Sequence, residues 1–151
     1  MAVVRPLHHL VAAFAASLVL AGCATGADQQ PAEPAVSLDV HGTWVIEQAR
    51  SAPLLDKRRA RLVLGRDGRL SGHNSCNAMN AAFTLADERI SIGPIATTRM
   101  ACGELLREQE DRVLTALELA ATARVRPDGL LELRDAEGRG VLRATRAPAV
   151  P

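Results

Sequence analysis

The chain has 151 residues, with 18 Lys and Arg against 17 Asp and Glu, which gives a formal net charge of +1 at pH 7. Nucleic-acid binding calls for a clustered positive surface, so this balance predicts no nucleic-acid partner. Aromatic residues make up 2% of the chain, with one Trp, two Phe and no Tyr. That composition argues against a stacking surface for bases or sugars.

Residues 1–22 have the pattern of a secretory signal peptide. Arg5 precedes an apolar run over positions 10–20, and the small residues Ala21 and Gly22 follow it. A permanent membrane-spanning helix needs roughly 20 apolar residues, so this shorter run favours a signal that is removed. The sequence therefore predicts export from the cytoplasm into surroundings where disulfides persist.

The segment Leu20-Ala-Gly-Cys23 resembles the lipobox of bacterial lipoproteins. The resemblance implies cleavage before Cys23 and lipidation of its sulfur, so that acyl chains hold the protein to a membrane. Ala24 stands where Asp would favour retention, which implies sorting to the outer membrane, on its periplasmic face. The alternative is an ordinary signal peptide with a chance cysteine.

Three further regions follow the signal peptide. Residues 23–38 comprise the lipidated cysteine and a stretch rich in Ala, Gln, Pro, Glu and Gly, whose composition predicts a flexible tether. Residues 39–146 are enough for one domain with a single core, and residues 147–151 are predicted to be a loose tail.

The first half of the domain is predicted to be built of strands. Residues 41–49 place Trp44 and Ile46 on one face and Val45 on the other, which is strand periodicity. Residues 61–64 and 69–73 form a predicted hairpin around Asp67-Gly68. Further strands are expected at 82–85 and 89–92, with an extended segment at 95–100.

The second half contains one predicted helix. Residues 104–121 have the spacing of an amphipathic helix, with acidic residues in its first half. Strands return at 122–126, 130–133 and 141–145, separated by turn sequences. The predicted fold class is α+β, mainly β: a curled antiparallel sheet or small barrel with one amphipathic helix.

Several motifs resemble those of the META domain, the family of the HslJ-like heat-shock lipoproteins. They are Gly42-Thr-Trp44, Gly72-His-Asn-Ser-Cys-Asn77, Thr97-Thr-Arg-Met-Ala-Cys102 and Glu110 before the apolar helical positions. Ala78-Met-Asn80 departs from the commoner pattern and puts the local turn there in doubt. The resemblance implies a curled antiparallel sheet with one helix, and a setting of heat or envelope stress or of antibiotic tolerance. The family has no established catalytic residues, so none is carried over.

Cys76 and Cys102 are an even pair in an oxidising compartment, and we expect a disulfide between them that stabilises the domain by about 3–4 kcal/mol. Three alternatives stay open at this point. They are a redox pair, a metal site formed with His73, and a thiol nucleophile with His73 as its base. A cleft that joined His73 to Glu110 would favour an enzyme.

Asn74, Asn77 and Asn80 lie around Cys76 and are expected to close turns by bonding nearby backbone. The alternative is an exposed polar loop that binds a partner. The basic residues of 57–61 are expected to lie in a solvated loop, or alternatively against anionic lipid.

The sequence as a whole predicts a non-enzymatic envelope lipoprotein without cofactor or metal, whose partners are a membrane and another envelope protein. The alternative is a small inhibitor or carrier of apolar ligands, which a deep cavity lined by Leu, Val and Ile would favour. The sequence leaves the oligomeric state open.

Overall fold

The computed structural model describes residues 39–148. The predicted signal peptide, Cys23, the predicted tether and the last three residues of the predicted tail lie outside the described residues. The elements are β1 Gly42–Ala49, β2 Ala52–Pro53, β3 Ala60–Leu64, β4 Arg69–Asn74, β5 Ala78–Ala86, β6 Arg89–Ile92, β7 Ala96–Thr97, α1 Glu104–Glu118, β8 Thr122–Val125, β9 Leu131–Arg134 and β10 Gly140–Arg146.

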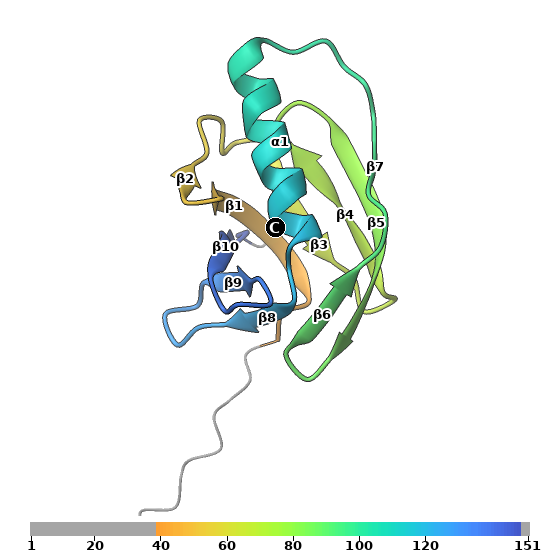
Figure 1. Cartoon of the computed structure of the whole chain (residues 1–151), viewed down its shortest axis with the longest axis vertical. Helices are drawn as coiled ribbons and strands as arrows, with labels where there is room; N and C mark the ends of the chain where they lie inside the picture. Colours follow the sequence, from red (N-terminus) through yellow and green to blue (C-terminus); the bar gives the residue numbers. More distant parts are fainter. Residues whose placement is uncertain (1–38, 149–151) are drawn as a thin grey trace, which may run out of the picture. The chain divides into compact units, whose positions relative to one another are not determined.

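Eight of the strands close into an antiparallel barrel (Figure 1). Its order is β10-β9-β8-β6-β5-β4-β3-β1, and β10 pairs with β1 to close the ring, while β2 pairs with β1 and β7 pairs with β5. The narrowest seam joins β6 to β8 through the single register pair Arg89 and Thr122. The predicted class, a mainly β small barrel with one helix, is confirmed.

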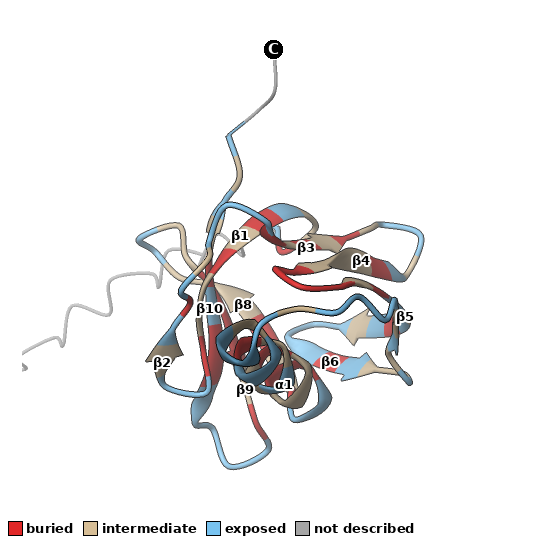
Figure 2. Cartoon of the chain, turned by 90° about the horizontal axis from the view of Figure 1, so that it is seen from above, coloured by how far each residue is buried: buried red, intermediate tan, exposed pale blue. Residues whose placement is uncertain are grey.

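The core forms because alternate side chains of each strand point inward. In β1 these are Trp44 and Ile46, both fully buried. The helix contributes its apolar side and packs against β1, β4 and β10. Figure 2, which looks along α1, shows the helix surrounded by the strands. The largest fully buried side chains are Trp44, Ile46, Leu62, Leu64, Leu70, Met79, Leu117, Leu131, Leu133, Leu142, Gln109 and Val113.

Several differences from the sequence-based expectations appear in the structure, and three of them have a clear physical cause. β5 begins at Ala78 rather than at residue 82, because this segment pairs with both β4 and β7. The helix ends at Glu118 rather than at residue 121, since Leu119 caps it. Ala147, expected in the loose tail, donates its N–H to Thr43 O at 2.9 Å. Within residues 39–148, no helix is long and apolar enough to cross a membrane.

The turn between β1 and β2 holds two ordinary residues in a strained conformation. Arg50 and Ser51 have φ of 51° and 66°, in the left-handed region that costs a non-glycine residue roughly 1–2 kcal/mol. We expect the double substitution Arg50→Asn and Ser51→Gly to raise the free energy of unfolding by about 1–2 kcal/mol, because these residues suit a two-residue hairpin turn. Urea unfolding should show a higher midpoint at unchanged slope, and a lower midpoint would contradict the expectation.

Candidate functional site

The candidate site is the region where the turn between β4 and β5 meets the segment that leads into α1. A disulfide joins Cys76 to Cys102 across this region, with 6.0 Å between their Cα atoms. Cys76 is buried and Cys102 is partly exposed. The disulfide therefore fixes the start of the helix to the end of the β4–β5 hairpin.

Asn74 shapes the turn that carries Cys76. Its side-chain Oδ1 accepts the backbone N–H of Cys76 at 3.1 Å and that of Asn77 at 2.7 Å. These bonds hold Ser75 at a φ of 88°, which is uncommon for a residue with a side chain. The predicted role of Asn74 in closing a turn is confirmed.

Asn77 connects this turn to the helix and to the segment after β7. Its Nδ2 donates to both carboxylate oxygens of Glu110 at 3.0 Å, and its Oδ1 accepts Thr98 Oγ1 at 2.9 Å and Met100 N at 2.7 Å. Asn74 Nδ2 donates to the same carboxylate at 2.9 Å. The Glu110 carboxylate therefore accepts hydrogen bonds from two side-chain amides of the same domain, and both asparagines are buried.

Gln109 was not identified from the sequence, yet its side chain is fully buried in the same network. Its Nε2 donates to Ser75 Oγ at 2.7 Å, and its Oε1 accepts Leu55 N at 2.6 Å. Ser75 Oγ in turn donates to Asp56 O at 2.6 Å. The sequence did offer one signal for Gln109, because a polar residue stands there at an apolar position of the helix. Its partners Leu55 and Ser75 are too distant in sequence to be predicted.

Asn80 lies apart from the network, on the outer side of β5. It is exposed and lines an open groove of about 690 Å³ on the surface of β3, β4 and β5. The neighbouring Met79 is fully buried in the core, and both residues belong to a regular strand. Residues 78–80, which depart from the commoner family pattern, therefore belong to β5 and form no turn.

Within residues 39–148, the structure forms neither the free thiol with His73 as its base nor the metal group that two of the alternatives require. His73 Nδ1 accepts the backbone N–H of Ser75 at 3.0 Å, and both thiols are consumed in the disulfide. Burial and the positive charge of Arg59 lower the pKa of His73. Within residues 39–148, no three His, Cys, Asp or Glu side chains are grouped to hold a metal ion.

The basic segment 57–61 is partly neutralised. Lys57 forms an ion pair with Glu47, and Arg61 Nη1 donates to Lys57 O at 2.9 Å. Arg58 and Arg59 are exposed, as expected for a solvated loop.

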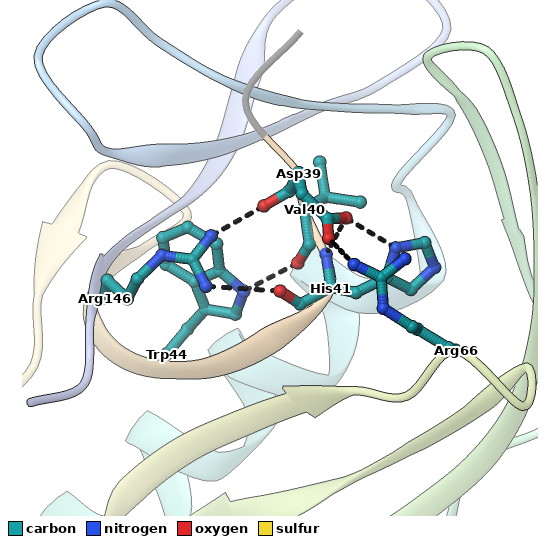
Figure 3. A network of polar contacts seen from close by, with 6 residues as sticks. All are labelled: Asp39, Val40, His41, Trp44, Arg66 and Arg146. Carbon is teal, nitrogen blue, oxygen red and sulfur yellow. Dashed lines mark hydrogen bonds and ion pairs between the residues drawn. The ribbon is translucent and has the colours of Figure 1, made fainter. Parts of the chain in front are cut away.

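The first described residues are tied to the rim of the barrel, as Figure 3 shows. Trp44 Nε1 donates to Val40 O at 2.8 Å, and the guanidinium carbon of Arg146 lies 4.1 Å from the centre of the Trp44 ring. Arg146 also donates to Asp39 O at 2.6 Å. These contacts fix the point at which the N-terminal segment reaches the barrel.

The Asp39 carboxylate makes this attachment sensitive to acid. The backbone N–H of His41, then the His41 ring and the charge of Arg66, hold the pKa of Asp39 below its ordinary value. A depressed folded-state pKa stabilises the fold above the unfolded pKa, and this contribution is lost as the pH falls. We expect Asp39→Asn to flatten the loss of stability between about pH 5 and pH 2, measured by urea unfolding across that range.

The matched control for Asp39→Asn is Glu88→Gln. Glu88 is exposed and forms no ion pair within the described part of the chain. Its substitution should leave the acid limb of the stability curve unchanged. Equal effects of the two substitutions would contradict the assigned role of Asp39.

The comparisons with known proteins identify the family and agree with the fold. A family model described as the META domain matches residues 36–148. One solved structure, an NMR structure of a protein from Burkholderia xenovorans, superposes with a TM-score of 0.56 at 25% identity, covering 80% of this chain and 99% of that one. A second NMR structure has a TM-score of 0.54 at 21% identity and covers 69% of this chain and 88% of that one. A search of functionally curated proteins finds no match. Because this family match spans all the described residues, the chain belongs to the META domain family.

Proposed function

We propose that the chain is a non-enzymatic lipoprotein of the cell envelope that supports tolerance of heat, envelope stress or an antibiotic by binding another envelope protein. The proposal places it on a membrane, through lipid on Cys23, with the barrel on the periplasmic face and the outer membrane as the expected destination. Family membership and the lipobox-like segment Leu20-Ala-Gly-Cys23 support this setting.

The observation that carries the non-enzymatic role is the saturation of the motif's polar groups. Asn74, Asn77 and Gln109 direct their amides to one another's backbone, to Ser75 and to Glu110. Catalytic acids, bases and nucleophiles need a reactive atom that faces a substrate. Here the amide side chains of Asn74, Asn77 and Gln109 are buried and bonded within the domain, and the partly buried Glu110 carboxylate accepts two of them, which supports a scaffold rather than a catalyst.

The interior of the barrel bears on the alternative of an apolar carrier. Carrier proteins of barrel architecture enclose a ligand cavity among their inward-facing side chains. In this barrel that space is occupied by large side chains such as Trp44, Leu62 and Met79, together with the buried side of α1. A filled interior favours contact with a partner through the outer surface.

The membrane setting is tested in the native bacterium by replacing the chromosomal copy with Cys23→Ala. We expect the protein to leave the membrane fraction, and survival under heat or antibiotic stress to fall to that of the deletion strain. The matched variant Ala24→Asp keeps the cysteine and should stay bound to membranes, with a shift towards the inner one.

Two outcomes contradict the proposed function. Continued sedimentation of Cys23→Ala with membranes would show that lipid on this residue is not the anchor. A deletion strain that survives stress as well as its parent would show that the protein has no role in tolerance. Crosslinking in the intact envelope then identifies the bound protein.

A further inference from the structure

The two sulfurs of the disulfide lie in different surroundings. Cys76 is buried, with 2% of its surface exposed. Asn77 Nδ2 donates to its Sγ at 3.3 Å, and Met100 O lies 3.7 Å from the same sulfur. Cys102 is partly exposed, and the residues before and after it in the chain are exposed. A reagent from solution therefore reaches Cys102 more easily than Cys76.

Charge adds to this difference between the two cysteines. The Glu110 carboxylate accepts the same Asn77 amide that donates to Cys76 Sγ. The reactive form of a thiol is the thiolate, which a negative group near its target repels. The exchange of a disulfide with a thiolate depends on access to the sulfur that is attacked. Packing and charge thus both favour attack at Cys102.

The disulfide holds a part of the chain that has few other ties to the barrel. Within residues 39–148, the last hydrogen bond to the barrel before α1 is donated by Met100 N. The first one after it is accepted by Gln109 Oε1, well inside the helix. Of the helical residues 104–108, all but Leu106 are exposed, and Leu106 is partly exposed. The bond from Cys102 is therefore the attachment that holds this segment against the barrel.

The first turn of α1 has little stability of its own. Gly103 is its N-cap residue and has no side chain that could bond the first backbone N–H groups. Short helical segments are marginal without tertiary packing, and the buried side of α1 begins only at Gln109. In Figure 1 this first turn and the loop that leads to it lie at one end of the barrel. Without the disulfide, residues 101–108 are expected to lose their fixed position while the rest of α1 stays packed.

We infer that an external dithiol opens the disulfide by attack on Cys102 Sγ, and that residues 101–108 then become mobile. A thiolate of the dithiol bonds to Cys102 Sγ, the bond between the two cysteines breaks, and Cys76 Sγ leaves as a thiolate that takes up a proton. The second thiol of the reagent loses its proton and attacks the reagent's own sulfur in the mixed disulfide. Cys102 leaves as a thiolate and takes up that proton. The dithiol is thereby oxidised to a disulfide, and its two electrons reduce the bond between Cys76 and Cys102.

The redox state of the surrounding thiols thus sets whether the start of α1 is ordered. The barrel closes through the pairing of β1 with β10, and neither strand contains a cysteine. The change is therefore local to the helix start and the loop before it. This inference goes beyond the proposed function and does not depend on it.

The site of attack is tested on the full chain with Cys23→Ala, purified in a mild detergent, which leaves Cys76 and Cys102 as its only cysteines. Glutathione is a monothiol, so it forms the first mixed disulfide and lacks the second thiol that would release it. After a short reaction the free thiol is blocked with N-ethylmaleimide, and mass spectrometry of tryptic peptides locates each adduct. Glutathione should be found on Cys102 at least about tenfold more often than on Cys76.

The same reaction in urea is the control for this selectivity. Unfolding removes the packing around Cys76 and its proximity to Glu110, so the two sulfurs should then react to about the same extent. Equal reaction at both cysteines of the folded protein, or a preference for Cys76, overturns the inference. A preference for Cys102 that persists in urea also overturns it, because the fold would then not be its cause.

The release of residues 101–108 is tested by a short pulse of hydrogen exchange on the same protein, oxidised or reduced with dithiothreitol. The amides of residues 107–110, which bond to carbonyls of residues 103–106, should exchange at least about tenfold faster after reduction. The amides of residues 113–117, in the packed half of the same helix, and those of β1 should stay protected during the pulse. Slow exchange at 107–110 after reduction, or an equal gain in all three places, overturns the inference.

A variant without the bond separates its loss from other effects of the reagent. Cys76→Ala with Cys102→Ala should show the fast exchange at residues 107–110 both with and without dithiothreitol. Protein that is reduced and then reoxidised should regain the slow exchange, which tests the same point without a substitution. Circular dichroism checks that each sample is folded. Slow exchange at 107–110 in the folded variant would show that the disulfide is not what holds the start of α1.

Discussion

Replacing Cys76 and Cys102 together with alanine should lower the free energy of unfolding by about 3–4 kcal/mol. The bond closes a loop with a sequence separation of 26 residues, and its main effect is to restrict the unfolded chain. A domain of this size has a total stability of roughly 5–15 kcal/mol. The disulfide thus supplies a large share of what keeps the barrel folded.

Urea unfolding with and without reductant measures the contribution of the disulfide. Oxidised wild type should unfold at a clearly higher midpoint than the double variant, and reduced wild type should unfold close to that variant. We expect the loss of stability to affect the helix and the β4–β5 hairpin together, because the disulfide joins these two elements. An oxidised wild type that unfolds at the midpoint of the double variant would contradict this role.

The second large effect is expected from Asn77→Ala, at about 3 kcal/mol of lost stability. The substitution removes both bonds to the Glu110 carboxylate and leaves Thr98 Oγ1 and Met100 N without their acceptor. Thr98 and Met100 are exposed, so the cost arises mainly at the partly buried Glu110 carboxylate, which keeps only the amide of Asn74 and for which the loss of a charged hydrogen bond is expensive. Unfolding in urea measures the loss.

Asn80→Ala is the matched control, because it deletes the same amide three residues along the chain. Asn80 is exposed, and surface substitutions of this kind usually change stability by less than about 0.5 kcal/mol. A double-mutant cycle between Asn77 and Glu110 isolates their coupling. Equal costs at positions 77 and 80 would show that the buried network is not a source of stability.

The hairpin of β3 and β4 shows what local chemistry determines. Its strands were predicted within one residue, because alternation and the Asp67-Gly68 turn act within a few positions of one another. Gly68 has a φ of 76°, the conformation that the turn needs and that glycine adopts freely. The short strands β2 and β7 were not predicted as such, since pairing with β1 and β5 defines them.

The candidate site also has features that the sequence predicted and features that it did not. The cysteine pair and the turn at Asn74 could be predicted, because residue type and expected export indicate the first, and contacts of two and three residues decide the second. The joint role of Glu110 could not be predicted, since its partner Asn77 lies 33 positions away in the sequence. Gln109 was missed for the same reason, although its polar side chain interrupts the apolar side of the helix.

The sequence by itself determined the strand and helix periods, the turns built on Asp-Gly and the family, because these depend on side-chain chemistry over short distances. Only the tertiary structure decided the closure of the barrel through β1 and β10, the burial of Asn74 and Asn77, and the bond from Leu55 N to Gln109. Each of these requires segments distant in sequence to occupy adjacent positions. Packing of the whole core selects that arrangement, and no local pattern encodes it.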